Sequence, residues 1–200
     1  MKRAYFLLGL LALGCLCSPG SCFLFHIFEE PAPQREFPVQ DLLVDATVFP
    51  ESWQTWRGPE PIPERERGER ESFYVAFRYE GLEPGILGAC HQVFRYRNRA
   101  RAAASFASHG FLKRHLITPW APPEGSSYKS PLAGRFRFEC AEVDIVGVPY
   151  STCEVVAQYD EFISEFWTNS SPGYLTLRDF ERILVAIDER MALHLGEDTH

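Results

Sequence analysis

The chain has 200 residues and a formal net charge of −7 at pH 7, from 20 Lys and Arg against 27 Asp and Glu. Hydrophobic residues make up 46% of it and aromatic residues 14%, which suffices for a packed core and excludes wholesale disorder. An acidic balance without a basic tract predicts no nucleic-acid partner. Six cysteines are too few for a fold held by disulfides alone.

Residues 1–17 have the pattern of a secretory signal peptide. Lys2 and Arg3 form a short positive start, and residues 4–14 form an apolar core. That core is shorter than the roughly 20 apolar residues that a membrane-spanning helix needs. The two basic residues hold the start of the chain on the cytoplasmic side, so the body is expected to be extracytoplasmic.

The end of this segment, Ala12-Leu13-Gly14-Cys15, resembles a bacterial lipobox. In a lipobox a small residue precedes the cysteine that becomes lipidated and forms the new N-terminus, and Gly14 fits that position. Ala12 and Leu13 depart from the usual pattern, which has leucine third and a small residue second before the cysteine. The resemblance implies a lipid anchor on Cys15.

Two other fates of the N-terminus remain open. The signal could be cut near residues 18–21, which would give a secreted protein. Alternatively, residues 22–28 are apolar again, so the broken stretch 4–28 is long enough to stay uncleaved as an anchor. Proline and small polar residues between its two halves weaken this reading, although membrane helices tolerate proline and glycine.

The rest of the chain divides into a tether, one domain and a short tail. Residues 18–40 are expected to be a tether, because residues 29–40 carry three prolines without a helical or strand period. A single domain is expected over 41–195, which is a usual domain size. Residues 196–200 are expected to be a frayed tail.

The first part of the domain has weak signals. Residues 41–48 could form a short helix or a strand. Trp53 and Trp56 are so close together that they are expected to plug an edge of the core, with an exposed binding surface as the alternative. Residues 58–71 mix charges of both signs with prolines and glycines, which predicts a solvated loop.

Alternating apolar residues predict a series of strands after this loop. A tight turn is expected at Asp160-Glu161, and a connection rich in proline, glycine and serine at 118–134. The predicted strands are 72–79, 89–97, 135–140, 143–146, 153–159 and 162–167.

Two helices are predicted as well. Asn98 can cap an Ala-rich helix over 99–113. In the last segment Thr176 is a good N-cap and Asp179 follows three residues later, so an amphipathic helix is expected from Leu177. The predicted fold class is therefore α+β: an antiparallel sheet on which the Ala-rich helix and the C-terminal helix pack.

Three segments carry a resemblance to known proteins: 94–96 running into 102–106, 153–157 and 185–190. With the order of the predicted elements, they resemble a family of bacterial extracytoplasmic lipoproteins and sensor domains, including the extracellular sensor domain of the mycobacterial kinase PknH. The layout is also similar to that of the PsbP/Mog1 group. The resemblance covers about residues 41–195. It implies an antiparallel sheet with helices on its faces and no shared catalytic set.

No motif for catalysis, metal or cofactor binding is found. The glycine-rich stretch 81–88 lacks the dinucleotide and phosphate-loop patterns, and the six histidines are scattered. Cys90 and His91 are neighbours on a predicted strand, so their side chains point to opposite faces and cannot act as a pair. We therefore expect no catalytic residue, no metal ligand and no cofactor.

Three cysteines lie in the body: Cys90, Cys140 and Cys153. In an oxidising compartment two of them are expected to pair. Cys140 with Cys153 is the first choice because both lie on strands close in sequence. Cys90 with Cys140 and three free thiols remain open.

The sequence thus favours a membrane-tethered, extracytoplasmic, non-enzymatic domain that binds a ligand or a partner protein at the membrane. One alternative is a structural subunit of a membrane complex, held by an uncleaved N-terminal anchor. The other is a secreted hydrolase, which would need a pocket with a histidine between a carboxylate and a nucleophile.

Overall fold

The computed structural model of the chain describes residues 35–63, 68–81, 88–110, 118–145, 148–170 and 174–196. The chain divides into two compact units, Met1–Ala32 and Pro33–His200, and every described residue belongs to the second. The predictions for the signal peptide, Cys15 and the end of the tail lie outside the described residues.

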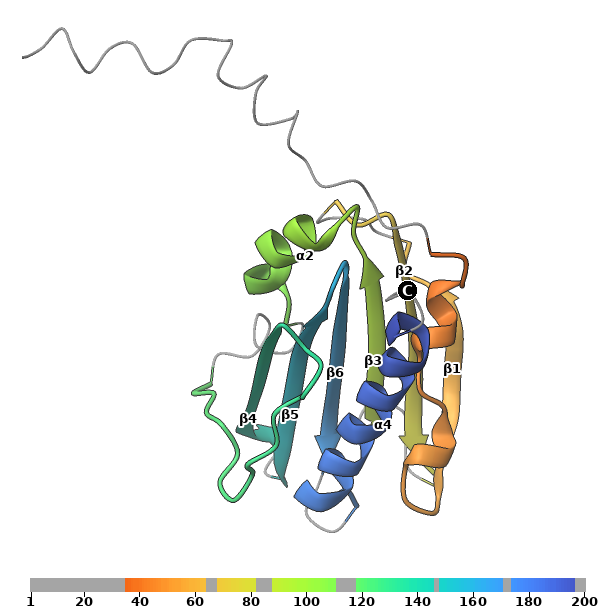
Figure 1. The fold of residues 1–200 in the computed structure, drawn as a ribbon. Helices are drawn as coiled ribbons and strands as arrows, with labels where there is room; N and C mark the ends of the chain where they lie inside the picture. Colours follow the sequence, from red (N-terminus) through yellow and green to blue (C-terminus); the bar gives the residue numbers. More distant parts are fainter. Residues whose placement is uncertain are drawn as a thin grey trace, which may run out of the picture. The chain divides into compact units, whose positions relative to one another are not determined.

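One six-stranded antiparallel sheet forms the body, with the strand order β1-β2-β3-β6-β5-β4 (Figure 1). All five pairs of neighbouring strands are antiparallel. The strands are β1 (Trp53–Pro61), β2 (Glu71–Tyr79), β3 (Gly88–Arg95), β4 (Arg135–Ile145), β5 (Val148–Tyr159) and β6 (Phe162–Ser170).

The long helix α4 (Leu177–Leu195) lies across one face of this sheet (Figure 1). The predicted capping box is present, since Thr176 and Asp179 each bond the other's backbone N–H. The shorter elements are α2 (Arg99–Ser105) and the 3₁₀ helices η1 (Val39–Leu42), η2 (Ala46–Val48) and η3 (Phe106–Ser108). The architecture is therefore of the mixed α+β class.

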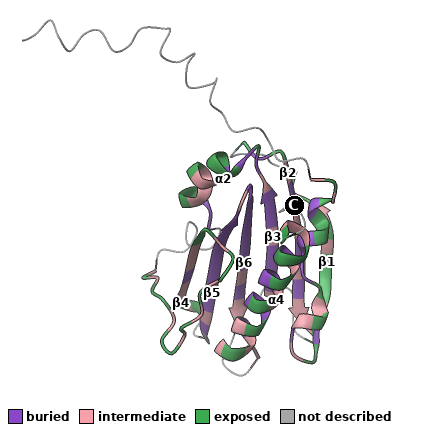
Figure 2. Cartoon of the chain, viewed as in Figure 1, coloured by how far each residue is buried: buried purple, intermediate pink, exposed green. Residues whose placement is uncertain are grey.

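The main core lies between α4 and the sheet. Figure 2 shows the buried residues on the central strands and on the inner side of α4, while β1 is mostly exposed. The apolar residues of α4 recur at helical spacing and meet the alternate residues of the strands. The largest fully buried apolar side chains of this core are Leu42, Phe77, Phe162, Phe166, Ile183 and Met191.

A smaller core lies on the opposite face of the sheet, under α2. Ala102 of α2 is fully buried there with Tyr96, Val156 and Ile163. The Ala-rich helix was expected to run over 99–113, but its α-helical part ends at Ser105. Phe106 continues it only as one 3₁₀ turn, so a single buried residue of α2 faces the sheet.

Residues 35–40 are packed against the domain, although the sequence predicts them as tether. The Arg35 side chain is 6% exposed and forms ion pairs with Asp160 and Glu161. Phe37 stacks on Phe162 at 5.9 Å between ring centroids, and Val39 is fully buried. The prolines do not prevent this packing, because only single residues of the segment make the contacts. Arg35 contacts the hairpin at Asp160 and Glu161, and Val39 lies in the main core.

The predicted solvated loop over 58–71 is wrong at both ends. Residues 58–61 continue β1, and Glu71 begins β2. Strand β1 lies at the edge of the sheet, where prolines are tolerated because one side of the strand needs no partner. Residues 41–48, expected as a short helix or a strand, include the end of the 3₁₀ helix η1 and all of η2, with no strand among them.

Two predicted strands, 135–140 and 143–146, form the single strand β4 as far as Ile145. Its eleven residues pair continuously with β5, so no break separates them. The tight turn is confirmed: Asp160 has a positive φ of 53°, and Tyr159 pairs directly with Phe162. A two-residue turn of this hand matches the twist of the flanking strands.

Candidate functional site

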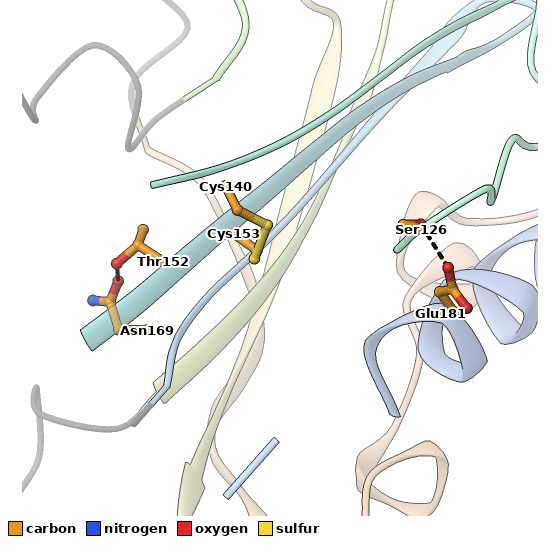
Figure 3. Close-up of a disulfide and its surroundings, with 6 residues drawn as sticks. All are labelled: Ser126, Cys140, Thr152, Cys153, Asn169 and Glu181. Carbon is orange, nitrogen blue, oxygen red and sulfur yellow. Dashed lines mark hydrogen bonds between the residues drawn. A yellow bond between two sulfur atoms is a disulfide. The ribbon is translucent and has the colours of Figure 1, made fainter. Parts of the chain in front are cut away.

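The three cysteines of the body have different environments. Cys140 and Cys153 are paired across β4 and β5 and form a disulfide, the first choice from the sequence (Figure 3). They lie on the sheet face that α4 covers. Cys90 is a free, buried thiol. The disulfide is compatible with an extracytoplasmic domain.

Cys90 and His91 point to opposite faces of β3, as the alternation of a strand requires. His91 lies on the α4 side, where its Nδ1 accepts the Val44 N–H at 3.2 Å and its Nε2 lies 2.9 Å from Ser164 Oγ. Cys90 lies on the other side. The pair therefore cannot form a nucleophile and base, and each residue has to be considered with its own face.

The face that carries Cys90 is hollowed where its side chains are small. Ala76 of β2, Cys90 of β3 and Trp167 of β6 are paired in register, so they form one row across the sheet. Gly88 lies one step along β3, beside Asn169 of β6. Ala76, Cys90 and Gly88 have short side chains or none, and they leave a cavity of about 340 Å³ between the larger side chains on either side. We call this cavity the aromatic groove.

Two tryptophans form the walls of the aromatic groove. Trp56 comes from β1, where the register shifts between Thr55 and Arg57. A bulge of this kind redirects a side chain, and Trp56 remains 51% exposed. Trp167 of β6 lines the opposite wall. Trp53, by contrast, is buried and plugs the edge of the core, as expected, whereas Trp56 is exposed.

Polar side chains close one end of the aromatic groove. Tyr74 and Gln92 are paired across β2 and β3 and both line it. The Arg57 guanidinium lies 5.7 Å from the centre of the Tyr74 ring, and it donates to Glu60 at 2.9 Å. Tyr74 Oη also donates to Glu60. This end therefore carries a hydrogen-bonded, locally neutral cluster.

The Cys90 thiol is chemically quiet. Its pKa is raised to about 12: burial is the largest cause, the hydrogen bond from Gln92 lowers the pKa in part, and the Glu165 carboxylate adds a smaller increase. The reactive form of cysteine is the thiolate. At neutral pH, Cys90 therefore serves as a small apolar side chain in the floor of the groove.

A buried polar network lies beside the groove on the same face. His109 Nδ1 is 2.5 Å from Glu165 Oε1, and His109 Nε2 is 2.6 Å from Tyr96 Oη. The exposed fractions of these three side chains are at most 2%. The Gly110 N–H also donates to Glu165 at 2.8 Å. The network thus ties the end of η3 to the centre of the sheet.

Gly110 is required where this network passes between two charged side chains. Its φ is +114°, which favours glycine. A Cβ atom there would lie 2.7 Å from Arg137 Nη2 and 2.9 Å from Glu154 Oε2. Arg137 in turn donates to the His109 carbonyl at 2.6 Å. The backbone at Gly110 is thus packed closely between Arg137 and Glu154, which indicates a structural role for this segment.

Further cavities lie elsewhere on the domain. One of about 540 Å³ adjoins the end of α4 and is lined by Arg35, Arg99 and Arg135. Another, of about 580 Å³, lies beside the disulfide and the start of α4. His109 lines none of these three cavities.

Across the described part of the chain, no three His, Cys, Asp or Glu side chains are grouped as metal ligands would be. No helix among the same residues has the length and apolar character needed to cross a membrane.

Neither the aromatic groove nor the His109 network is predicted by the sequence. The groove depends on the register of four strands, which brings Ala76, Cys90 and Gly88 together from two of them. The sequence offers a signal only for Trp56, since an exposed surface is one of the two alternatives for the tryptophan pair. His109 and Glu165 are 56 residues apart and carry no local motif.

No protein-family model and no curated protein matches this sequence. A solved structure of a protein from Bacteroides thetaiotaomicron is similar over 67% of this chain, with 12% sequence identity and a TM-score of 0.34. The chain spans 40% of that protein's length. These comparisons assign no family, so the resemblances to the PknH sensor domain and to the PsbP/Mog1 group stay expectations.

Proposed function

We propose that this protein is a membrane-tethered, extracytoplasmic, non-enzymatic domain that binds a small, largely apolar ligand in the aromatic groove. The observation that carries the proposal is the groove itself: a hollow between Trp56 and Trp167, floored by small side chains. Ligand sites are typically concave and mostly apolar, with a few placed polar groups. The proposal also includes the layout that the resemblance to the PsbP/Mog1 group implies, an antiparallel sheet with helices on its faces.

The dimensions of the groove favour a small molecule over a partner protein. Its volume of about 340 Å³ lies at the lower end of the range for small-molecule sites. A stable protein interface needs roughly 800 Å² on each partner. An exposed tryptophan on an edge strand also supplies a flat apolar surface that a ligand can cover.

The chemistry of the neighbouring groups supports a binding role rather than a hydrolytic one. A hydrolase needs a nucleophile, a base and an accessible space between them. The Cys90 thiol has a raised pKa, and His109 is buried with its two ring nitrogens next to Glu165 and Tyr96. We therefore assign His109 to holding the fold together.

Ligand binding can be tested with the neutral fluorescent probe phenylnaphthylamine. Trp56→Ala should weaken its binding to the full chain about tenfold, since an aromatic wall contributes about 1.5 kcal/mol. Ala76→Phe, which fills the floor, should abolish the fluorescence change. Leu193→Ala is the matched control, because Leu193 on α4 is 60% exposed and remote from the groove.

The probe also partitions into lipid or detergent carried by the N-terminal segment. Binding is therefore measured as the difference between each variant and the wild type under identical conditions. Equal binding by the wild type, Trp56→Ala and Ala76→Phe would refute the groove as a ligand site.

The tether can be tested separately. The lipobox resemblance implies that Cys15 carries a lipid, so cells grown with labelled palmitate should yield a labelled protein. Cys15→Ser should remove the label. An unlabelled wild-type protein released intact into the medium would contradict the tether. An intact Met1 on the membrane-bound form would instead favour the uncleaved anchor over lipidation.

A further inference from the structure

The end of the aromatic groove away from Tyr74 carries two hydrogen-bond donors. Arg78 of β2, Gly88 of β3 and Asn169 of β6 are paired in register, so they form the next row beyond Ala76 and Cys90. All three line the groove. Since Gly88 has no side chain, β3 places no side chain between Arg78 and Asn169 in this row.

One donor of the Arg78 guanidinium is buried without a partner. Its Nε atom is buried, and no described residue accepts a hydrogen bond from it. Buried donors of a charged group are costly when they have no partner. The other arginine of the groove, Arg57, differs because Glu60 already accepts from it.

Asn169 is oriented by its neighbour. Its Oδ1 accepts from Thr152 Oγ1 at 2.9 Å, which directs the amide so that the oxygen is used within the fold (Figure 3). The amide NH₂ is then the group left to donate. At the same end, Thr168 Oγ1 donates to the Gly88 carbonyl at 3.0 Å, which engages the acceptor of the intervening residue.

We propose that this end of the groove binds an anionic group, so that the ligand is a small amphiphile with an apolar body and one carboxylate, sulfonate or phosphate. The apolar body lies over Ala76 and Cys90 between the two tryptophans. The anionic group accepts from Arg78 and from the Asn169 amide, since guanidinium and amide donors suit an oxyanion. This inference rests on the proposed function and specifies the ligand class of the same groove.

The test compares two probes that differ in one group. Anilinonaphthalene sulfonate has the same ring system as phenylnaphthylamine and adds a sulfonate. Arg78→Gln should weaken sulfonate binding about tenfold, which is the loss of roughly one charge-assisted hydrogen bond. Binding of the neutral probe to the same variant should change less than about twofold, and this also shows that Arg78→Gln is folded.

Two further variants sharpen the result. Arg78→Lys retains the charge and should restore part of the sulfonate affinity. Arg182→Gln on α4, whose arginine is 56% exposed and pairs with Asp179, should leave both probes unaffected. Loss of both probes to the same degree in Arg78→Gln, or loss of neither, would overturn the anion site. The groove itself would fail only if Trp56→Ala and Ala76→Phe both left binding of the neutral probe unchanged, so the two failures are distinguishable.

Discussion

Replacing Arg35 with methionine is expected to lower the free energy of unfolding by about 3–5 kcal/mol at pH 7. The Arg35 side chain is 6% exposed, and its Nε lies 3.1 Å from Glu161 Oε1. The Glu161 side chain is 1% exposed, and its second carboxylate oxygen has no donor among the described residues. Without Arg35, a buried carboxylate loses its counter-charge. Urea unfolding of the wild type and the variant measures the difference.

The loss should depend on pH. Burial, as the largest cause, raises the pKa of Glu161 above its ordinary value. A carboxyl whose folded-state pKa is raised favours the protonated folded state, so its contribution to stability is full at low pH and lost as the pH rises through that pKa. In Arg35→Met this effect is stronger, so the variant should recover part of its deficit as the pH is lowered towards that pKa.

A surface ion pair provides the matched control for Arg35. Arg182 lies 3.4 Å from Asp179 on α4 and is 56% exposed. Exposed pairs of this kind contribute about 0–1 kcal/mol, so Arg182→Met should change little. A loss below about 1 kcal/mol in Arg35→Met would show that the buried ion pair between Arg35 and Glu161 contributes no more to stability than an exposed pair.

Acid should destabilise the protein through His91, by about 2–3 kcal/mol between pH 6.5 and pH 4.5. Burial, followed by the charge of Arg190, lowers the pKa of His91 from 6.5 to about 3. Below pH 6.5 the unfolded chain therefore binds a proton on His91, whereas the folded chain keeps this histidine neutral until the pH approaches 3. Stability is full above pH 6.5 and is lost as the pH falls towards 3.

The hydrogen bonds of His91 explain why the folded chain favours the neutral imidazole. Since Nδ1 accepts the Val44 N–H, the ring proton is on Nε2, where Ser164 Oγ can accept it. A second proton would occupy Nδ1, break the bond to Val44 and place a charge in the apolar core. His91→Gln and His91→Asn cannot titrate, so their stability should fall less between the two pH values.

Ser164→Ala separates titration from hydrogen bonding. It removes a hydrogen-bond partner of His91 but keeps the imidazole, so it should lower stability at both pH values with the slope retained. Urea unfolding at pH 6.5 and pH 4.5 gives both numbers for each variant. Equal slopes in the wild type and in both His91 variants would show that His91 does not carry the acid response.

Local sequence signals identified the elements whose pattern is self-contained. The capping box at Thr176 and the apolar spacing of α4 lie within one helix, and the alternation of 72–79 lies within one strand. The Asp160-Glu161 turn follows from the two strands that flank it. Signals of this kind depend on neighbours in the chain and survive without knowledge of the fold.

Local sequence patterns did not predict structure that depends on contacts with distant parts of the chain. Residues 58–61 read as a loop because of their prolines, yet they form an edge strand where β2 offers its free side. Arg35 and Val39 read as tether, yet they pack against a hairpin more than 120 residues away and into the main core. The sequence spacing contains no record of such contacts.

Local sequence patterns were sufficient to predict the α+β class, the C-terminal helix and the opposite orientation of the Cys90 and His91 side chains, because each follows from a local period of 3.6 or 2. The sequence also favoured the pairing of Cys140 with Cys153 by their proximity on strands. The grouping of Ala76, Gly88 and Cys90 in the floor of one groove follows from the fold, because strand register aligns small residues from different segments. The same register aligns Arg78 and Asn169 on either side of Gly88, where the proposed anionic group would bind.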